Sequence, residues 1–264
     1  MINYWWVSRP KRKLNSVPSV LATFVETSLN VEWQGQRDIH LLFEEALERD
    51  ELKRFGLRRD QGGSGARTYA AWLKSLGLIF TQESTKKIRL TLAGEAIING
   101  DNPVTVLKNQ IFKYQFPSSF SISRGVHVAD RFVIRPFLFL VRLLADPQIG
   151  FLTTEEIAKI VITEAENESD ACFIHIVKRI LEFRESSDEC LSDDFFEKYQ
   201  PSRGKISEDH PFERLLDVSN TIINWLEYTQ LIERDSGIIR IFDDKTEAVR
   251  SEEHTSELQS HHDL

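Results

Sequence analysis

The first regular alternation of apolar and polar positions starts near residue 38. Ile39, Leu42, Phe43 and Leu47 recur at intervals of three and four residues, together with Ala46. This spacing places all five side chains on one face of a helix, with the charged residues between them on the other face. The pattern therefore predicts an amphipathic helix that packs one side against a core.

A second helical pattern covers residues 66–76. Its apolar face carries Tyr69, Trp72 and Leu73, and Gly77 follows as a residue suited to a C-terminal cap. Two short apolar runs, 78–80 and 88–92, then flank a polar stretch that is typical of a turn. Helix, loop, helix and hairpin in this order predict a winged helix.

The same pattern recurs later in the chain. Residues 225–232 repeat the Trp-Leu and apolar spacing of residues 72–79 at an offset of 153, and an Ile-Arg-apolar strand follows each copy at 88–90 and 239–241. Further helices are expected before the second copy, at 137–145, at 153–163 with Thr153 or Thr154 as N-cap and Glu156 near N3, and at 174–183.

These elements predict a mainly α fold with small β-hairpins, of the α+β class, built from two winged-helix-like units in tandem. The expected segments are an aromatic and basic N-terminal arm (1–34), a first winged-helix unit (35–98), a connecting basic and amide-rich segment (99–135) and a second winged-helix-like unit (136–249). Residues 250–264 resemble one reading frame of a sequencing adapter and are excluded as a scar. We therefore expect the natural reading frame to continue beyond Val249.

Composition excludes several classes of protein. With 264 residues and 41% apolar side chains, the chain can bury a core, so it is not intrinsically disordered. The apolar stretch 134–144 contains Arg135, Pro136 and Arg142 and is too short to cross a bilayer, which needs about 20 residues. The basic run near the N-terminus follows the apolar residues, the wrong order for a secretory signal. A soluble, cytoplasmic protein without a membrane partner is expected.

Charge is distributed unevenly. The formal net charge is −8, but residues 1–140 carry 20 Lys and Arg against 13 Asp and Glu, whereas residues 141–264 carry 13 against 28. A polyanion would therefore be attracted to the first half of the chain and repelled by much of the second. Glu227, Glu233, Asp235, Asp243 and Asp244 surround the second helix and hairpin, and their acidic surface suits protein contact better than DNA.

No small catalytic motif stands out. Cys172 and Cys190 are too few for a disulfide framework or a four-cysteine zinc site, and His127 and His175 are interpreted as structural. The sequence has neither a nucleophile elbow nor a glycine-rich phosphate loop followed by lysine. Acyl transfer and nucleotide hydrolysis are therefore disfavoured.

Most of the groups that are expected to bind duplex DNA lie in the first unit, and the others lie in the N-terminal arm and the connecting segment. In a helix-turn-helix the second helix meets base edges and the wing reaches phosphates, and arginine is shaped for two parallel hydrogen bonds to guanine. The predicted DNA-binding residues are Arg9, Lys11, Arg12, Arg58, Arg59, Ser64, Arg67, Thr68, Lys74, Lys86, Lys87, Arg89, Lys108, Gln110, Lys113 and Gln115.

Two of these groups have a plain structural alternative. The loop Gly62–Gly65 could let backbone amides approach a phosphate, but a flexible connector is the favoured interpretation. The amides and cations of 108–118 could read adenine edges, or they could be the solvated side of a helix whose apolar face holds Val104, Leu107 and Ile111. For this segment both interpretations stay open.

Several motifs, in order, resemble the N-terminal recognition region of the AlwI-type type IIS restriction endonucleases, a family that includes nicking enzymes. The resemblance covers residues 5 to about 242. It is carried by Trp6-Val7-Ser8 with Arg9, Arg67-Thr68-Tyr69, Leu76 to Phe80, Leu90 to Gly94, Leu107 to Ser118, Ile134 to Val141 and the segment around Trp225.

The resemblance implies recognition of a short asymmetric double-stranded DNA site through winged-helix subdomains, with cleavage a short distance to one side. It also implies a separate C-terminal nuclease domain of the PD-(D/E)xK type, in which carboxylates hold Mg²⁺ beside a lysine. Double-strand cleavage would call for a second subunit or dimerisation. No cofactor is expected for residues 1–249 themselves.

Two short stretches of this sequence are similar to the nuclease motif. Glu51-Leu52-Lys53 has the right spacing but belongs to a charged helical run, interpreted as a solvated face. Asp243-Asp244-Lys245 follows an apolar strand but ends the second hairpin. Neither is assigned to catalysis, so the catalytic domain is expected after the adapter junction.

The leading hypothesis is thus the recognition region of a type IIS restriction or nicking endonuclease without its nuclease domain. Composition and charge equally allow a non-enzymatic winged-helix regulator or adaptor. A third possibility is a pair of winged helices that act only as a protein scaffold, which would not retain DNA at low salt.

Overall fold

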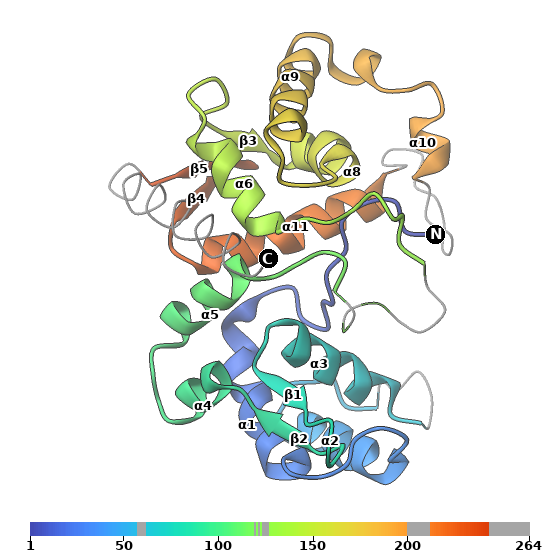
Figure 1. The fold of residues 1–264 in the computed structure, drawn as a ribbon, viewed down its shortest axis with the longest axis vertical. Coiled ribbons are helices and arrows are strands. Elements are labelled where there is room, and N and C mark those ends of the chain that lie inside the picture. Colours follow the sequence, from blue (N-terminus) through green and yellow to red (C-terminus); the bar gives the residue numbers. More distant parts are fainter. Residues whose placement is uncertain (57–61, 119, 121, 123–126, 200–211, 243–264) are drawn as a thin grey trace. The chain divides into compact units, whose positions relative to one another are not determined.

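The computed structural model describes residues 1–56, 62–118, 120, 122, 127–199 and 212–242. These residues form a mainly helical structure with two small antiparallel sheets, one of two strands and one of three (Figure 1). The predicted α+β class is confirmed. Within the described residues, every helix is too short or too polar to cross a membrane.

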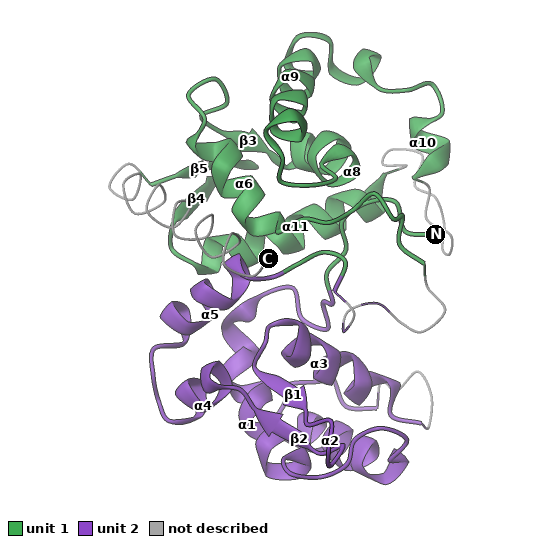
Figure 2. Cartoon of the chain, in the orientation of Figure 1, with its two compact units in different colours: residues 1–7, 115–117, 126–264 green, residues 8–114, 118–125 purple. Residues whose placement is uncertain are grey.

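The chain divides into two compact units (Figure 2). Unit 1 contains residues 1–7, 115–117 and 126–264, and unit 2 contains residues 8–114 and 118–125. The boundaries expected from the sequence ran differently, because they placed residues 1–34 in one arm. In the structure the first seven residues belong to unit 1, and the helix α1 (Val17–Ser28) belongs to unit 2.

The first α-helix of unit 2 is α1, whose Pro18 lies at a helix start where its missing N–H costs nothing. Phe24 of α1 packs edge-on against Phe43, with ring centroids 5.0 Å apart. The remaining elements are η1 (Leu14–Ser16), α2 (Arg37–Arg49), α3 (Ser64–Ser75), β1 (Ile79–Thr81), β2 (Ile88–Leu90), α4 (Leu92–Ile98) and α5 (Pro103–Phe112).

The hairpin of unit 2 gains a third short partner from the segment before α2. The Asn30 N–H donates to the carbonyl of Ile88, and the Ile88 N–H donates to the carbonyl of Val31. Glu32 and Lys87 form an antiparallel bridge beside these bonds. The backbone of β2 is thereby bonded on both sides, to β1 and to residues 30–32.

Helix α4 is docked closely on the turn that joins α3 to β1. The Thr91 N–H donates to the carbonyl of Leu78, and the Thr91 hydroxyl donates to the carbonyl of Gly77 at 2.6 Å. A Cβ on Gly94 would lie 2.1 Å from the Leu78 carbonyl oxygen, a distance that only glycine permits. The end of α3 is therefore fixed to the α4 backbone.

Unit 1 is built around α6 (Pro136–Ala145) and α11 (Glu213–Tyr228). Most of α6 is buried, and Phe137 stacks on Trp225 with ring centroids 5.7 Å apart. The other elements are β3 (Leu152–Thr153), the continuous helical segment α7 (Thr154–Glu156), η2 (Ile157–Val161) and α8 (Ile162–Glu164), then α9 (Asp170–Ser186), η3 (Ser187–Cys190), α10 (Phe195–Lys198), β4 (Ile232–Asp235) and β5 (Ile238–Ile241).

The predicted start of α7 is confirmed at Thr153. Its hydroxyl accepts from the Glu156 N–H, and the Glu156 carboxylate accepts from the Thr153 N–H, which completes a capping box. The strand before this cap, β3, pairs with β5, so the sheet order is β3-β5-β4.

Two aromatic residues near the N-terminus, Tyr4 and Trp5, are part of the core of unit 1. Trp5 is fully buried, and its indole N–H donates to the carbonyl of Ala165 at 2.7 Å. Trp6 lies against the guanidinium of Arg214. An indole gains most when its ring is buried and its N–H is satisfied, which is what Trp5 achieves here.

The predicted repeat is visible in both units. Trp72 and Trp225 are fully buried in the last turns of α3 and α11. Gly77 and Gln230 both adopt a left-handed backbone, with φ of 67° and 61°, before a hairpin. The tandem arrangement of two winged helices stays a prediction.

Candidate nucleic-acid interface

Helix α3 is held at its start by two glycines. Gly63 is the N-cap with φ of 72°, and a Cβ there would lie 2.5 Å from Cβ of His40. A Cβ on Gly65 would lie 2.3 Å from Oε1 of Glu44. Ser64 and Gly65 are helical and Gly63 is packed against α2, so the flexible connector expected at 62–65 is wrong for these residues.

The outer face of α3 carries the predicted recognition residues. Arg67 and Thr68 are exposed in the first turn and a half. The Arg67 guanidinium donates to the Gly62 carbonyl, and the Thr68 hydroxyl donates to the Ser64 carbonyl at 3.0 Å. These two side chains are thus ordered along the surface of the helix near its start.

His40 of α2 packs against Gly63 at the start of α3. It is buried, and its Nε2 lies 2.8 Å from the Trp33 carbonyl, so this nitrogen carries the proton and donates it. Burial lowers the pKa of His40 below its ordinary 6.5; the hydrogen bond to Trp33 acts in the opposite direction, and the positive charge of Arg67 adds to the lowering.

Lys74 is used inside the fold. Its ammonium donates to the Thr81 hydroxyl at 2.9 Å and ties the last turn of α3 to β1. Burial lowers the pKa of Lys74. Its contact with DNA stays a prediction. In the structure, Lys74 connects α3 to β1.

The turn between β1 and β2 presents two cations. Lys86 and Lys87 are exposed, and Lys86 adopts a left-handed backbone with φ of 57°. Arg89 behaves differently, because its guanidinium donates to Gln82 at 3.1 Å and to Asn30. The exposed cations of this hairpin are therefore the two lysines, whereas Arg89 is half-buried.

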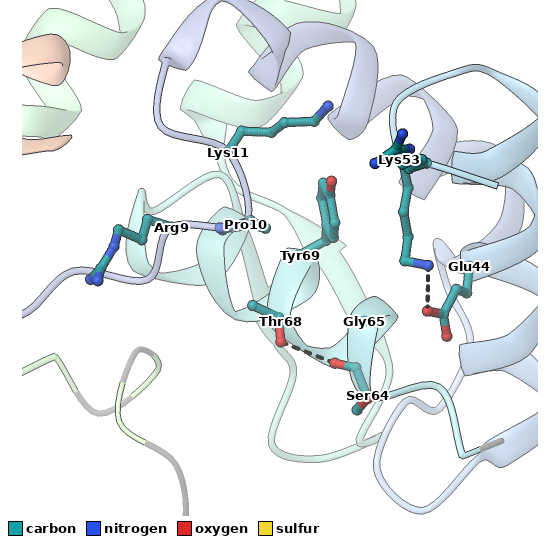
Figure 3. Close-up of a pocket in the computed structure, with 10 residues that line it drawn as sticks. Arg9, Pro10, Lys11, Glu44, Lys53, Ser64, Gly65, Thr68 and Tyr69 are labelled. Atoms are coloured by element: carbon teal, nitrogen blue, oxygen red, sulfur yellow. Dashed lines mark hydrogen bonds and ion pairs between the residues drawn. The ribbon is translucent and has the colours of Figure 1, made fainter. Parts of the chain in front are cut away.

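A pocket of about 450 Å³ opens beside the first turn of α3 (Figure 3). All of its lining residues belong to unit 2. They come from the segment before α1, from α2 and the loop after it, and from α3: Arg9, Pro10, Lys11, Glu44, Lys53, Arg54, Ser64, Gly65, Thr68 and Tyr69.

The wall of this pocket contains a buried ion triad. Glu44 and Glu48 lie one helical turn apart on α2, and the Lys53 ammonium lies 3.1 Å from a carboxylate oxygen of each. Figure 3 shows the Lys53 ammonium turned toward Glu44. The charged run at residues 48–51 was expected to be a solvated face, which is wrong for Glu48, because its side chain is only 4% exposed.

The phenol of Tyr69 forms another part of this wall. Its hydroxyl donates to the carbonyl of Leu52 at 3.0 Å and so holds the loop after α2 against α3. Burial raises the pKa of Tyr69 to about 12, so the phenol stays a hydrogen-bond donor at neutral pH.

The segment 108–118 contains the amphipathic helix that was one of its two interpretations. Leu107, Ile111 and Phe112 are buried in α5, and Tyr114 is buried just after it. Gln110 approaches the turn at Gly77, where a Cβ would lie 2.7 Å from its Oε1. A DNA contact by the polar side of this segment stays a prediction, for which Lys113 and Gln115 are exposed and Lys108 is half-buried.

The other predicted residues are spread over several places. Arg9 and Lys11 line the pocket, Arg12 is exposed nearby in sequence, and Arg58 and Arg59 lie outside the described residues. Sequence reasoning missed Lys53 and Arg54 as members of the same pocket. Hydrophobic periodicity carries no signal for them, because the pocket joins segments that lie far apart along the chain.

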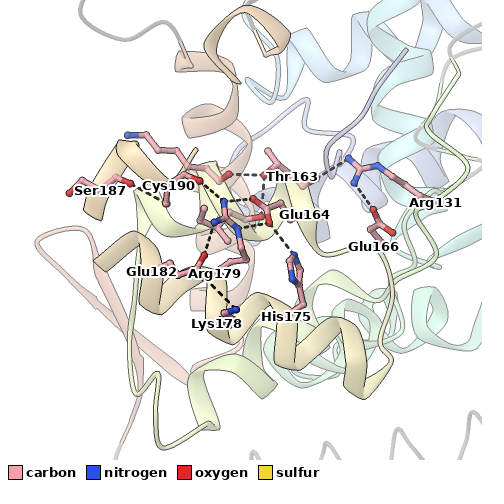
Figure 4. A network of polar contacts seen from close by, with 12 residues as sticks. Arg131, Thr163, Glu164, Glu166, His175, Lys178, Arg179, Glu182, Ser187 and Cys190 are labelled. Atoms are coloured by element: carbon pink, nitrogen blue, oxygen red, sulfur yellow. Dashed lines mark hydrogen bonds and ion pairs between the residues drawn. The ribbon is translucent and has the colours of Figure 1, made fainter. Parts of the chain in front are cut away.

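Unit 1 has a polar network of its own (Figure 4). Arg131 donates to Glu166 at 2.7 Å and to the carbonyls of Asn3 and Thr163. Glu164 receives Arg179 at 3.0 Å and His175 at 3.3 Å. These arginines join segments of unit 1 to one another. A pocket of about 310 Å³ in the same unit is lined by Arg131, Glu164, Glu166, Asn167, Cys172 and His175.

The described residues contain no group of three or more His, Cys, Asp and Glu side chains that could hold a metal ion. In the triad of unit 2, the Lys53 ammonium occupies the place between the two carboxylates. A Mg²⁺ site does not fit this arrangement. Asp243, Asp244 and Lys245 lie outside the described residues.

Comparison with known proteins places the chain in a family. A search of curated proteins gives no match. A solved structure with TM-score 0.61 and 16% identity covers 96% of this chain and 84% of its own, and its title reads "Crystal structure of pyrene- and phenanthrene-modified DNA in complex with the BpuJ1 endonuclease binding domain". This likeness shows the fold. The model of the AlwI restriction endonuclease family matches residues 74–252, about two thirds of the chain. The chain therefore belongs to the AlwI restriction endonuclease family.

Proposed function

We propose that this chain is the sequence-specific double-stranded DNA recognition region of a type IIS restriction or nicking endonuclease, which cuts a short distance outside an asymmetric site. The observation that carries the proposal is the exposed face of α3. Arg67 and Thr68 stand in its first turns, and the exposed Lys86 and Lys87 follow on the adjoining hairpin. An arginine near a helix start and cations on a wing match base and phosphate contacts respectively.

Two further observations support this function. The chain belongs to a restriction endonuclease family, and the similar solved structure is described by its title as an endonuclease binding domain with DNA. In each unit, a short extended segment also pairs with the hairpin. In unit 2, residues 30–32, just before α2, pair with β2. In unit 1, β3, just before α7, pairs with β5. This order of helices and strands supports two winged helices.

The nuclease chemistry would belong to a domain beyond these residues. A PD-(D/E)xK centre needs a carboxylate pair and Mg²⁺. The buried acids of unit 2 face Lys53 instead, and no step of cleavage is assigned to them. The family enzyme would thus separate recognition from cutting.

Gel-shift measurement on random duplexes at low salt is the first test. The chain is expected to retain duplex DNA, and the logarithm of its affinity is expected to fall linearly with the logarithm of salt concentration, because phosphate contacts release counterions. Selection from a randomised duplex pool should then enrich one asymmetric sequence. No retention at low salt would contradict the proposal and favour a scaffold.

A longer read of the gene tests the enzymatic part. A downstream apolar strand followed by Glu-x-Lys would support a nuclease domain, and the full protein with Mg²⁺ should cut or nick outside the selected sequence. A coding region that stops near Val249 would contradict an enzyme and favour the regulator or adaptor.

A further inference from the structure

We propose that the pocket of unit 2 lined by Lys11, Arg54 and Ser64 binds one backbone phosphate of the DNA. This phosphate clamp, as we call the three residues and the pocket between them, rests on the proposed DNA-recognition function and adds a defined contact to it. The position of the clamp follows from the pocket, which opens directly beside the first turn of α3 (Figure 3).

The charges around the pocket favour an anion. Lys53 is paired with two carboxylates at 3.1 Å, and this triad carries one net negative charge, so the attraction for an anion comes from the other cations of the lining. Lys11 and Arg54 differ, since neither has an ion-pair partner in the described part of the chain. Arg54 is exposed at the rim and Lys11 is half-buried, so both can turn toward a ligand without losing an existing ion pair.

The start of α3 adds neutral donors to these cations. Gly63, the N-cap residue, has no side chain that could cap the helix. The Ser64 hydroxyl and the backbone of Gly65 line the pocket beside the positive end of the helix dipole. The missing Cβ at Gly65 leaves room for the Glu44 and Lys53 side chains, which pack against this part of the pocket wall.

The volume suits a phosphodiester. The pocket of about 450 Å³ is larger than a lone phosphate needs. The remaining space would accept an adjoining sugar. Glu44 of α2 also lines the pocket, but the three clamp residues come from the segment before α1, the loop after α2 and the start of α3. A phosphate bound to them would hold these three segments of unit 2 together.

This placement gives the clamp a specific task. Phosphate contacts fix the register of a protein on the duplex, whereas base edges carry the sequence information. A phosphate bound beside Ser64 would set the height of α3 along the groove, and hence which base edge Arg67 meets. Loss of the clamp should therefore weaken binding to all duplexes.

The test compares Arg54→Ala and Lys11→Ala with the matched control Arg49→Ala on random duplex DNA at several salt concentrations. Arg49 is also an arginine of unit 2, but it pairs with Glu26 and Asp50 on the surface and does not line the pocket. Each clamp variant is expected to reduce the slope of log affinity against log salt by about 1. Arg49→Ala should leave the slope unchanged, and Arg54→Lys should restore it.

The outcomes separate this proposal from the function on which it rests. If wild-type protein binds DNA but both clamp variants keep its slope, the clamp is wrong and DNA recognition stands. If wild-type protein binds no duplex, both are wrong. Circular dichroism of each variant verifies folding, and Lys11→Ala decides the matter if Arg54→Ala fails to fold.

A second arm identifies the source of the phosphate. Inorganic phosphate is titrated into the wild-type protein without DNA, and chemical shifts of the Ser64 and Gly65 amides are followed by NMR. Weak, saturable shifts that Arg54→Ala abolishes support the clamp. Tight binding of inorganic phosphate that does not compete with duplex DNA would overturn it in favour of a separate site for free phosphate.

Discussion

The two helix–hairpin pairs, α3 with β1-β2 in unit 2 and α11 with β4-β5 in unit 1, share an interior and differ at the surface. Each buries a tryptophan completely and passes through a left-handed residue into an antiparallel hairpin. The exposed residues differ. Arg67, Lys86 and Lys87 are on the first pair, whereas Glu227, Glu233 and Asp235 are on the second.

The two hairpins also differ in their turns. Six residues, 82–87, separate β1 from β2, and they place two lysines at the end of the hairpin. Only Ser236 and Gly237 separate β4 from β5, and both have positive φ, as a tight two-residue turn requires. The buried residues thus specify the shared backbone, while charge and turn length would select the partner.

The largest expected effect tests the shared interior. Trp72→Ala and Trp225→Ala should each lower the free energy of unfolding of their own unit by about 3–5 kcal/mol, because each removes a fully buried indole. Hydrogen exchange, resolved for each unit, measures the loss. Phe55→Ala is the control, since Phe55 is 85% exposed and should change little. A loss below about 1 kcal/mol for either tryptophan would refute a common core.

The second prediction concerns the difference in surface. Arg67→Ala should weaken binding to the selected DNA sequence by roughly 1–3 kcal/mol if this side chain reads a base. Glu227→Ala, an exposed change on the other helix, should cause no loss. Gel-shift titration on selected and random duplexes provides the measurement. An equal loss on both duplexes would make Arg67 a phosphate contact.

The third prediction concerns Gly77 and Gln230, the left-handed residues that precede the two hairpins. Gln230→Gly should stabilise unit 1 by about 1 kcal/mol, because a left-handed backbone is costly for a residue with a side chain. Gly77→Ala should destabilise unit 2 by about 1–2 kcal/mol for the same reason, and Gln110 would also have to move. Denaturant unfolding monitors both. The two variants should change the free energy of unfolding in opposite directions. A stabilising Gly77→Ala would contradict the structural equivalence of Gly77 and Gln230.

The smallest expected effect is a pH dependence confined to unit 2. The folded pKa of His40 lies below 6.5, so the unfolded chain takes up the proton first as the pH falls. This contribution to stability is complete above pH 6.5 and is lost as the pH falls from 6.5 toward the folded pKa. Hydrogen exchange across this range should show the loss in unit 2. His40→Gln should remove it while keeping a donor to Trp33, and an unchanged profile would exclude His40 as the cause.

Sequence patterns predicted the elements whose apolar residues recur on one face. The helices around Phe43, Trp72 and Trp225 and both hairpins were expected because burial of a periodic face determines them. The cap at Thr153 and the turn at Gly77 were also expected, since their local chemistry is strong. These features depend on neighbours within a few residues.

Other features depended on contacts between distant segments. Helix α1 was missed as part of the N-terminal arm, although Val17, Val20, Leu21 and Phe24 have helical spacing that could have revealed it. The pocket could not be predicted, because no local pattern links Lys11, Arg54 and Ser64. Likewise, the burial of Glu48 follows from its pairing with Lys53 across a turn, which charge composition alone does not indicate.

The path of the backbone between the units has a practical consequence for preparing them separately. Unit 2 is inserted within unit 1, since residues 1–7 precede it and residues from 126 onward follow it. A simple truncation after residue 125 would therefore leave Trp5 without the Ala165 carbonyl that accepts its indole proton. Residues 115–117 also belong to unit 1, and Phe116 pairs with Ile134, so a linker that joins residue 7 to residue 126 would remove this pairing from unit 1. Excision of residues 8–125 as one piece would likewise carry three residues of unit 1 along with unit 2.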